Sequence, residues 1–278
     1  MGPTVEDLFD ASCPSPSALE VEMDVRRTLL IVLLAVTSLL IGPVVAGPAY
    51  AITNGSLDGN RHPAVGGLVS PTQYSDGTWI YCSGTLISST VFLTAAHCAE
   101  DGERVLVTFD ADYEAGDKLY SGTFQADSAY PGTSADSHDI AVVVLDRAVK
   151  GITPARLPTE GSLSDLSSSQ TFTSVGYGAY EVTNSPGGHQ YLYDDRRMVA
   201  VGTLNATNKT WLRISMNAST GNGGTCYGDS GGPNFLGQTN VIAAITITGD
   251  AVCRATNVTY RLDTDSARSF LSSYIGLP

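Results

Sequence analysis

Charged side chains are scarce in this sequence. They make up 15% of its 278 residues, and 28 acids face only 15 bases, which leaves a net charge of -13. A surface of that sign repels phosphate backbones, so we expect no nucleic-acid partner. The low charge and the many glycine, serine and threonine residues are typical of a turn-rich extracellular β-protein rather than a helical cytosolic enzyme.

Sustained helical periodicity is missing until the C-terminus. Short β-branched or alternating runs take its place, separated by turn signals such as Asp76-Gly77 and Pro131-Gly132. The runs are Thr85–Thr94, Val105–Phe109, Ile140–Leu145, Thr171–Val175, Val241–Thr248 and Thr256–Leu262. They fall into two sets on either side of the serine-rich segment Gly161–Ser169, so we predict an all-β fold of two packed β-barrels.

The C-terminal segment is the exception to this strand pattern. Five apolar residues follow the i, i+3, i+4, i+7, i+8 spacing of one helix face: Ala267, Phe270, Leu271, Tyr274 and Ile275. Asp263 or Thr264 is placed to cap the start, and Gly276 follows the last turn. We predict an amphipathic C-terminal helix of about three turns.

Only five cysteines are present, and the first of them, Cys13, stands far upstream of the rest. The other four are Cys82, Cys98, Cys226 and Cys253, and four cysteines allow three pairings. If each cysteine pairs with its neighbour in the sequence, each half of the chain contains one disulfide bond. Disulfide bonds imply an oxidising compartment.

Long apolar runs are lacking except for one near the N-terminus. This run follows the basic pair Arg26-Arg27, breaks at Gly42-Pro43, and leads to Ala49-Tyr50-Ala51, an A-x-A cleavage site. The break and the small residues after it disfavour an uncleaved membrane anchor.

We therefore interpret residues 23–51 as a signal peptide. Its removal predicts a secreted, extracellular protein that begins at Ile52 and has no membrane contact after cleavage. Residues 1–22 carry no fold signal, and we interpret them as an upstream extension or a mis-assigned start.

The segment Cys226-Tyr-Gly-Asp-Ser-Gly-Gly-Pro233 carries the strongest chemical signal. Ser230 sits among small residues that let a substrate backbone approach closely. The backbone N–H groups of Gly228 and Ser230 are placed to point at one spot, as an oxyanion hole that stabilises a tetrahedral acyl-transfer intermediate. We predict Ser230 as a nucleophile and Gly228 as its partner in that hole.

A serine hydroxyl is a weak nucleophile and needs a base. Of the four histidines, only His97 ends an apolar strand beside a cysteine, in Leu93-Thr-Ala-Ala-His-Cys98. An imidazole base in turn needs a carboxylate to fix its tautomer. Asp139 opens the apolar run Asp-Ile-Ala-Val-Val-Val-Leu145, where a charge is costly unless it is paired. We predict that His97 and Asp139 activate the serine.

Together these motifs resemble the chymotrypsin/trypsin family of serine proteases. The resemblance rests on Leu-Thr-Ala-Ala-His-Cys, on Asp-Ile-Ala and on Gly-Asp-Ser-Gly-Gly-Pro, with gaps of 42 and 91 residues between His97, Asp139 and Ser230. It covers residues 52–278. It implies a serine endopeptidase that hydrolyses peptide bonds through an acyl-enzyme, takes polypeptide substrates, needs no cofactor and is a candidate target of protein protease inhibitors.

The resemblance also implies the fold. We expect two packed six-stranded antiparallel β-barrels: an N-terminal barrel over residues 52–165 with His97 and Asp139, and a C-terminal barrel over residues 166–278 with the nucleophile, specificity pocket and C-terminal α-helix. The family disulfides correspond to Cys82–Cys98 and Cys226–Cys253. The segment Gly176-Tyr-Gly178 looks like the family's glycine-aromatic-glycine segment.

A second ion pair follows from the same resemblance. In the family, a buried carboxylate beside the nucleophile pairs with a new N-terminal ammonium, and that pair shapes the oxyanion hole. Asp229 and Ile52 occupy these positions, and a buried carboxylate without a partner is strongly unfavourable. We expect signal peptidase itself to free Ile52, so that the enzyme is active once secreted, without a zymogen propeptide.

The specificity pocket departs from the trypsin-like pattern. In trypsin-like members an acidic residue stands six positions before the serine, where this chain has Gly224. The resemblance places Gly249 and Val258 on the pocket walls, with Gly249 leaving the entrance open and Val258 narrowing the base. We expect an uncharged residue at P1, the substrate position before the cleaved bond.

The resemblance also implies a serine hydroxyl close to Asp139, and this hydroxyl is missing at its expected position. Counting back from Cys253 puts Ile247 where the family usually has a serine, and Thr246 or Thr248 takes its place if the register shifts by one. Without that hydroxyl, we expect the Asp139 carboxylate to lack one hydrogen bond.

Other interpretations compete with the endopeptidase. A catalytically silent protease-fold binding protein normally lacks a triad member, and none is lacking here; an enzyme acting mainly on esters uses the same triad. The acidic loop 110–117 matches no calcium-binding loop spacing, so we expect a solvated loop and no metal. Nothing in the sequence indicates oligomerisation, and we expect a monomer.

Overall fold

The computed structural model of this protein describes Ile52 and residues 54–278. The interpreted signal peptide (23–51) and the segment 1–22 lie outside the described residues. Within the described part, no helix is long and apolar enough to cross a bilayer.

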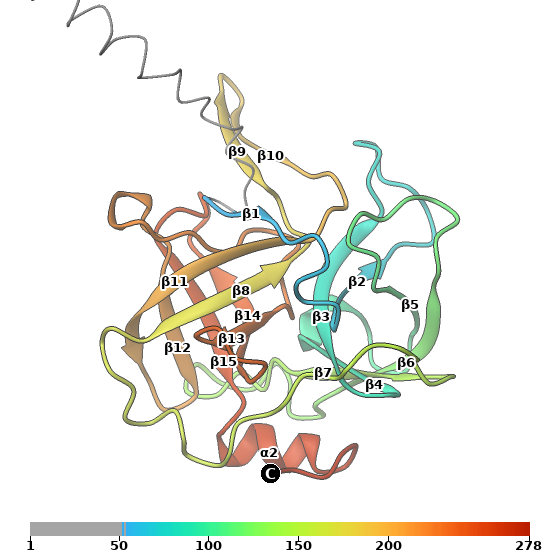
Figure 1. Cartoon of the computed structure of the whole chain (residues 1–278), viewed down its shortest axis with the longest axis vertical. Helices are drawn as coiled ribbons and strands as arrows, with labels where there is room; N and C mark the ends of the chain where they lie inside the picture. Colours follow the sequence, from blue (N-terminus) through green and yellow to red (C-terminus); the bar gives the residue numbers. More distant parts are fainter. Residues whose placement is uncertain (1–51, 53) are drawn as a thin grey trace, which may run out of the picture. The chain divides into compact units, whose positions relative to one another are not determined.

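The first barrel closes in the order β2-β3-β4-β7-β6-β5, and all of its neighbouring strands are antiparallel. Its strands are β2 Val65–Val69, β3 Ile80–Ser88, β4 Val91–Thr94, β5 Arg104–Thr108, β6 Tyr120–Ala126 and β7 Ala141–Leu145. The run Thr85–Thr94, expected as one strand, contains the turn Ser89-Thr90 between β3 and β4. Figure 1 shows these strands in blue to green.

The second barrel is also six-stranded and antiparallel. Its strands are β8 Thr171–Gly176, β11 Met198–Thr207, β12 Trp211–Ser215, β13 Pro233–Leu236, β14 Ile242–Gly249 and β15 Thr256–Arg261. They follow the order β11-β12-β15-β14-β13-β8, and pairing of β11 with β8 closes the ring (Figure 1). The predicted fold class of two six-stranded antiparallel barrels is confirmed.

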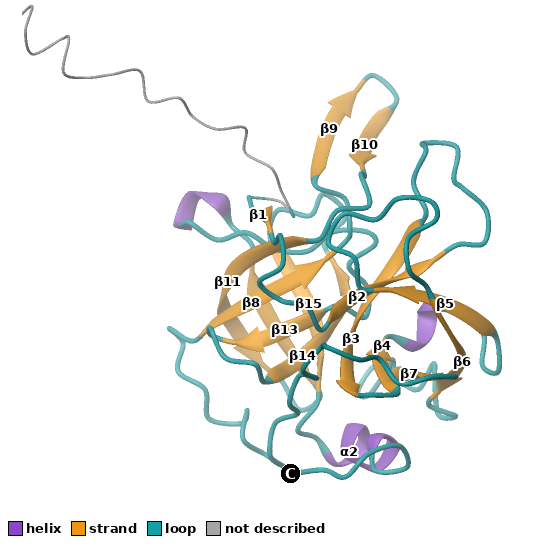
Figure 2. Ribbon diagram, turned by 45° about the vertical axis from the view of Figure 1, so that its right-hand side comes forward, coloured by secondary structure: helices purple, strands orange, loops and turns teal. Residues whose placement is uncertain are grey.

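Two additions extend the second barrel. The short strand β1, Ser56–Leu57, pairs with β11, so a segment expected to belong to the first barrel adds to the sheet of the second. Among the described strands, β9, Glu181–Ser185, and β10, Gly188–Leu192, pair only with each other, and their hairpin projects from the barrel (Figures 1 and 2).

The apolar runs form strands because both barrels bury them. In β7, the residues Ala141, Val142 and Val143 are fully buried, and only Val144 faces out. Each fully buried valine or leucine side chain contributes about 1.5–3 kcal/mol. This burial fixes the start of β7, and therefore the position of Asp139, which stands two residues before the strand and whose side chain bears on function.

The C-terminal helix is shorter than its spacing predicts. Helix α2 covers Asp265–Leu271, and the Thr264 side chain caps it by accepting a hydrogen bond from the Ala267 N–H (Figure 2). Tyr274 and Ile275 follow in turns, yet they still pack against the main core. The prediction of about three helical turns was therefore wrong. The apolar spacing reflects which residues pack against the core, and residues in the turns after the helix pack there as well.

Ser83 of β3 ties the two barrels together. Its N–H donates to the Ser230 carbonyl at 2.9 Å, its hydroxyl donates to the Gly228 carbonyl at 3.0 Å, and that hydroxyl accepts from the Tyr177 N–H at 2.9 Å. These bonds hold the segment around Ser230, from the second barrel, against the first barrel.

Candidate active site

His97 lies in the 3-10 turn η1, Ala96–Cys98, which begins two residues after the last residue of β4. The disulfide Cys82–Cys98 fastens this turn to β3, and the Thr94 hydroxyl bonds the Ser83 carbonyl at 2.8 Å. The backbone that carries His97 is therefore fixed on both sides, as expected for a group that must keep one orientation.

Asp139 receives two hydrogen bonds from this histidine. One carboxylate oxygen accepts from the His97 backbone N–H at 3.0 Å, and the other lies 2.8 Å from the ring Nδ1. The aspartate is only 7% exposed. Because an ionised carboxylate only accepts, Nδ1 carries the proton, and Nε2 of a neutral ring is left as an acceptor.

Ser230 shares a pocket of about 720 Å³ with His97 and Gly228. Among the described residues, no hydrogen bond joins the Ser230 hydroxyl to His97, a contact that is often long without substrate. Nor do the N–H groups of Gly228 and Ser230 donate to any acceptor in the described part of the chain. Gly228 has φ +94°, a conformation that glycine adopts without strain.

Asp229, next to the serine, is fully buried. Its carboxylate accepts from the backbone N–H groups of Gly178 at 2.9 Å and Cys226 at 2.8 Å. A side chain at Gly176 or Gly178 would overlap this carboxylate, which explains the glycine-aromatic-glycine segment. Burial raises the pKa of Asp229 to about 7, against the two backbone hydrogen bonds that lower it.

No salt bridge reaches Asp229 within the described residues. Ile52, its expected partner, is fully buried and packs with Met198, Ala200 and Tyr180. In the full chain the Ile52 nitrogen belongs to a peptide bond with Ala51, so it carries no charge there.

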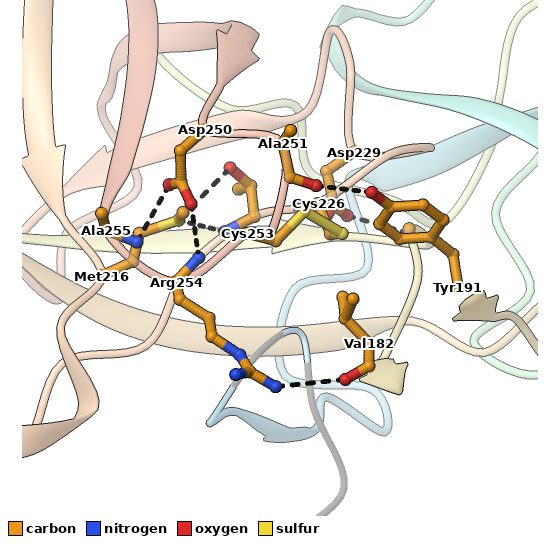
Figure 3. The surroundings of a disulfide bond; sticks show 12 residues. Val182, Tyr191, Met216, Cys226, Asp229, Asp250, Ala251, Cys253, Arg254 and Ala255 are labelled. Atoms are coloured by element: carbon orange, nitrogen blue, oxygen red, sulfur yellow. Dashed lines mark hydrogen bonds between the residues drawn. A yellow bond between two sulfur atoms is a disulfide. The ribbon is translucent and has the colours of Figure 1, made fainter. Parts of the chain in front are cut away.

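Both cysteines of the disulfide Cys226–Cys253 (Figure 3) line the pocket. Gly249 lines the pocket as expected, but the structure places Gly224 and Val258 away from its surface. Val258 lies in β15, where it pairs with Arg213 and Thr248.

None of the three residues considered for the missing hydroxyl bonds Asp139. The Thr246 hydroxyl accepts from the buried amides of Asn234 at 3.1 Å and Asn257 at 3.3 Å. Ile247 occupies a bulge in β14, and Thr248 is exposed. Within the described chain, His97 alone donates to Asp139.

Several pocket residues had no signal in the sequence. Four tyrosines and two acids line it, one from strand β3 and the others from separate loops: Tyr81 of β3, and Tyr74, Asp76, Tyr193, Tyr227 and Asp250. Burial, helped by the charges of Asp229 and Asp76, raises the pKa of Tyr193 to about 12, so its hydroxyl remains a donor at neutral pH. Only folding brings these side chains together, because they come from segments that are distant in the sequence.

The carboxylate of Asp250 is largely used within its own loop. It accepts from the backbone N–H groups of Arg254, Ala255 and Thr256 at 2.8–3.0 Å (Figure 3). The β9–β10 hairpin braces the same loop, because the Tyr191 hydroxyl donates to the Ala251 carbonyl at 2.5 Å. These bonds fix one side of the pocket.

His138 has a role that its sequence position did not reveal. Its Nδ1 lies 2.9 Å from Asp127 and its Nε2 lies 3.8 Å from Asp136, and its backbone has φ +50°. Asp136 in turn accepts from the hydroxyls of Tyr260 and Ser266. The residue before Asp139 is therefore anchored to β15 and α2 rather than lying free on the surface.

Comparison with known proteins agrees with this geometry. The family model named Trypsin matches residues 59–269. Chymotrypsin of Phaedon cochleariae is 28% identical over 188 residues, which cover 63% of this chain and 65% of that protein, slightly less than two thirds. A solved structure of HL collagenase has the same fold, with a TM-score of 0.62 at 19% identity over 81% of this chain and 99% of that one.

Proposed function

The chain belongs to the trypsin family of serine proteases, and from this premise we propose that it is a secreted serine endopeptidase that uses His97, Asp139 and Ser230. The observation that carries the proposal is the double hydrogen bond from His97 to Asp139, since His97 lines the same pocket as Ser230. A catalytically silent relative has no need of that arrangement.

The proposed reaction begins with proton transfer. Nε2 of His97 takes the proton of the Ser230 hydroxyl as the oxygen attacks the carbonyl carbon of the substrate. Asp139 stabilises the imidazolium that forms. The same imidazolium then protonates the leaving amine, which leaves an acyl-enzyme on Ser230. Water, activated by His97, hydrolyses that ester and restores the serine.

The N–H groups of Gly228 and Ser230 are proposed to bind the oxyanion in both steps. Neither N–H has an acceptor within the described chain, so each is available to a substrate. Losing one donor of such a hole typically costs 10²–10³ in kcat.

The N-terminus is proposed to complete this hole. Cleavage after Ala51 turns the Ile52 nitrogen into an ammonium, which pairs with the buried carboxylate of Asp229. The raised pKa of Asp229 supports the proposal, because this carboxylate lacks the partner that would keep it ionised. N-terminal sequencing of the secreted enzyme tests it, and a start other than Ile52 contradicts it.

The cellular location and the substrate class are proposed from the remaining features of the chain. The signal-peptide features and the two disulfides support secretion into an oxidising compartment, where polypeptides are the substrates and protein protease inhibitors are candidate partners. Since Gly224 carries no charge at the position that is acidic in trypsin-like members, an uncharged P1 residue is expected.

Cleavage-site profiling tests the proposal. The secreted protein is incubated with a mixed peptide library and its products are identified by mass spectrometry, with Ser230→Ala as the control. Cuts that require Ser230 support an endopeptidase. Turnover of esters without amides indicates an esterase, and the absence of cuts above the control indicates a silent binding protein.

A further inference from the structure

The floor of the pocket is where this chain departs most from the expected arrangement. Gly224 stands where trypsin-like members carry an acidic side chain, yet it does not reach the pocket surface. A Cβ added to Gly224 would overlap the Cγ and Sδ atoms of Met216. Another side chain therefore already fills the space into which a residue at this position would project.

Met216 is held firmly in that space. It follows β12, it is 1% exposed, and its backbone N–H donates to the Ala255 carbonyl at 2.9 Å. Its sulfur accepts from the Thr225 N–H at 3.1 Å and lies 4.0 Å from the Thr225 hydroxyl. Figure 3 shows Met216 in the surroundings of the disulfide Cys226–Cys253, whose two cysteines line the pocket.

The position of Thr225 connects Met216 to the substrate space. Thr225, like Cys226, lines the pocket, so the thioether lies one residue layer beneath the lining. A thioether is uncharged, polarisable and only a weak acceptor, so it offers no counter-ion to a basic side chain. Because the thioether supports the lining from beneath, it limits how far the pocket extends toward Gly224 and favours short apolar groups over long ones.

We propose that Met216 determines the P1 specificity of this enzyme, by closing the base of the pocket beneath Gly224 and Thr225 and limiting P1 to small or medium uncharged side chains. The proposal rests on the proposed endopeptidase function. Met216 acts on the size of the pocket and takes no part in bond cleavage.

The alternative on the same pocket is Asp250. Its carboxylate lines the pocket and is a potential partner for a basic P1 residue. Its three backbone hydrogen bonds already engage both oxygens and hold the carboxylate within its own loop, which favours the Met216 proposal.

The test measures kcat/KM of the secreted enzyme on four peptide amides that differ only at P1: Ala, Leu, Phe and Lys. Met216→Ala is expected to raise the Phe-to-Ala ratio about tenfold or more, the range that pocket methylenes supply. Met216→Val, which leaves a smaller void, is expected to raise it less and serves if the alanine variant does not fold.

Leu212→Ala is the matched control. Leu212 is fully buried on β12 but packs with Leu163 and Phe172, so its removal costs stability without opening the pocket. The control is expected to keep the wild-type P1 ratio.

Three results overturn the proposal. One is an unchanged Phe-to-Ala ratio in folded, active Met216 variants. Another is a wild-type preference for Lys that Asp250→Asn removes, which assigns P1 recognition to Asp250. The third is wild-type turnover no higher than that of Ser230→Ala, and it alone also overturns the proposed function.

Discussion

Asp139 holds His97 through both of its carboxylate oxygens, one on the backbone N–H at 3.0 Å and one on Nδ1 at 2.8 Å. This double contact fixes the ring and its tautomer at once. Since no described threonine or serine hydroxyl assists Asp139, the histidine orientation depends on these two bonds.

Replacing Asp139 with Asn is therefore expected to abolish most of the activity. An amide donates through its nitrogen, which favours the wrong tautomer of His97, and in well-studied members of this family such a change lowers kcat by about 10⁴-fold. Single-turnover and steady-state kinetics on a peptide amide check it. Asp146→Asn, an exposed acid paired with Arg104, is the control and is expected to keep the wild-type kcat.

His138→Ala is expected to lower kcat roughly tenfold with little change in KM, because small displacements of a catalytic group cost rate. The histidine anchors the segment just before Asp139 through Asp127 and Asp136. Steady-state kinetics measure the split, with the exposed His189→Ala as control. A proportional rise in KM with unchanged kcat would contradict a positioning role.

The Asp58–Arg197 pair offers a test of stability. Both side chains are buried, the Arg197 Nε donates to Asp58 at 2.9 Å, and Asp58 is the only acid paired with this arginine among the described residues. Asp58→Asn leaves a buried cation without its counter-ion, and we expect a loss of about 3–5 kcal/mol in the free energy of unfolding. Urea denaturation measures it.

The matched control for that prediction is the exposed pair Arg104–Asp146. Solvent screens its attraction, so breaking it with Asp146→Asn is expected to cost far less than Asp58→Asn. Equal losses in the two variants would show that burial does not determine how much the Asp58–Arg197 pair contributes to the free energy of unfolding.

Local motifs made the fold predictable and supplied the residues of the candidate site. His97, Asp139 and Ser230 each lie in a short segment that singles them out. These segments are a strand end beside a cysteine, the start of an apolar strand, and a glycine-rich turn. The two disulfides and the two barrels follow from the same motifs by resemblance. The strands closed as expected because their apolar runs permit burial in only a few ways.

The pocket was less predictable because it is built from residues that are distant in the sequence. Gly224 and Val258 were assigned by counting along the chain, and counting does not reveal that Met216 fills the space beside Gly224. Likewise, β1 joins the second barrel through its pairing with β11, a contact of long sequence separation.

The last prediction concerns pH and the N-terminus. With the Ile52 nitrogen in a peptide bond, burial raises the pKa of Asp229 from an ordinary 3.8 to about 7. The folded chain then holds a proton that the unfolded chain has released, so its stability falls as pH rises through the interval from about 4 to about 7. The total loss is on the order of 4 kcal/mol.

The form that begins at Ile52 is expected to lack this loss, because the new ammonium pairs with the carboxylate and keeps it ionised. Urea midpoints at pH of about 5 and about 8 compare that form with one that retains Ala51. Asp229→Asn in the longer form removes the titrating group and is expected to flatten its pH dependence. If both forms lose the same stability between the two pH values, the Ile52 ammonium does not reach Asp229, and another group must organise the oxyanion hole.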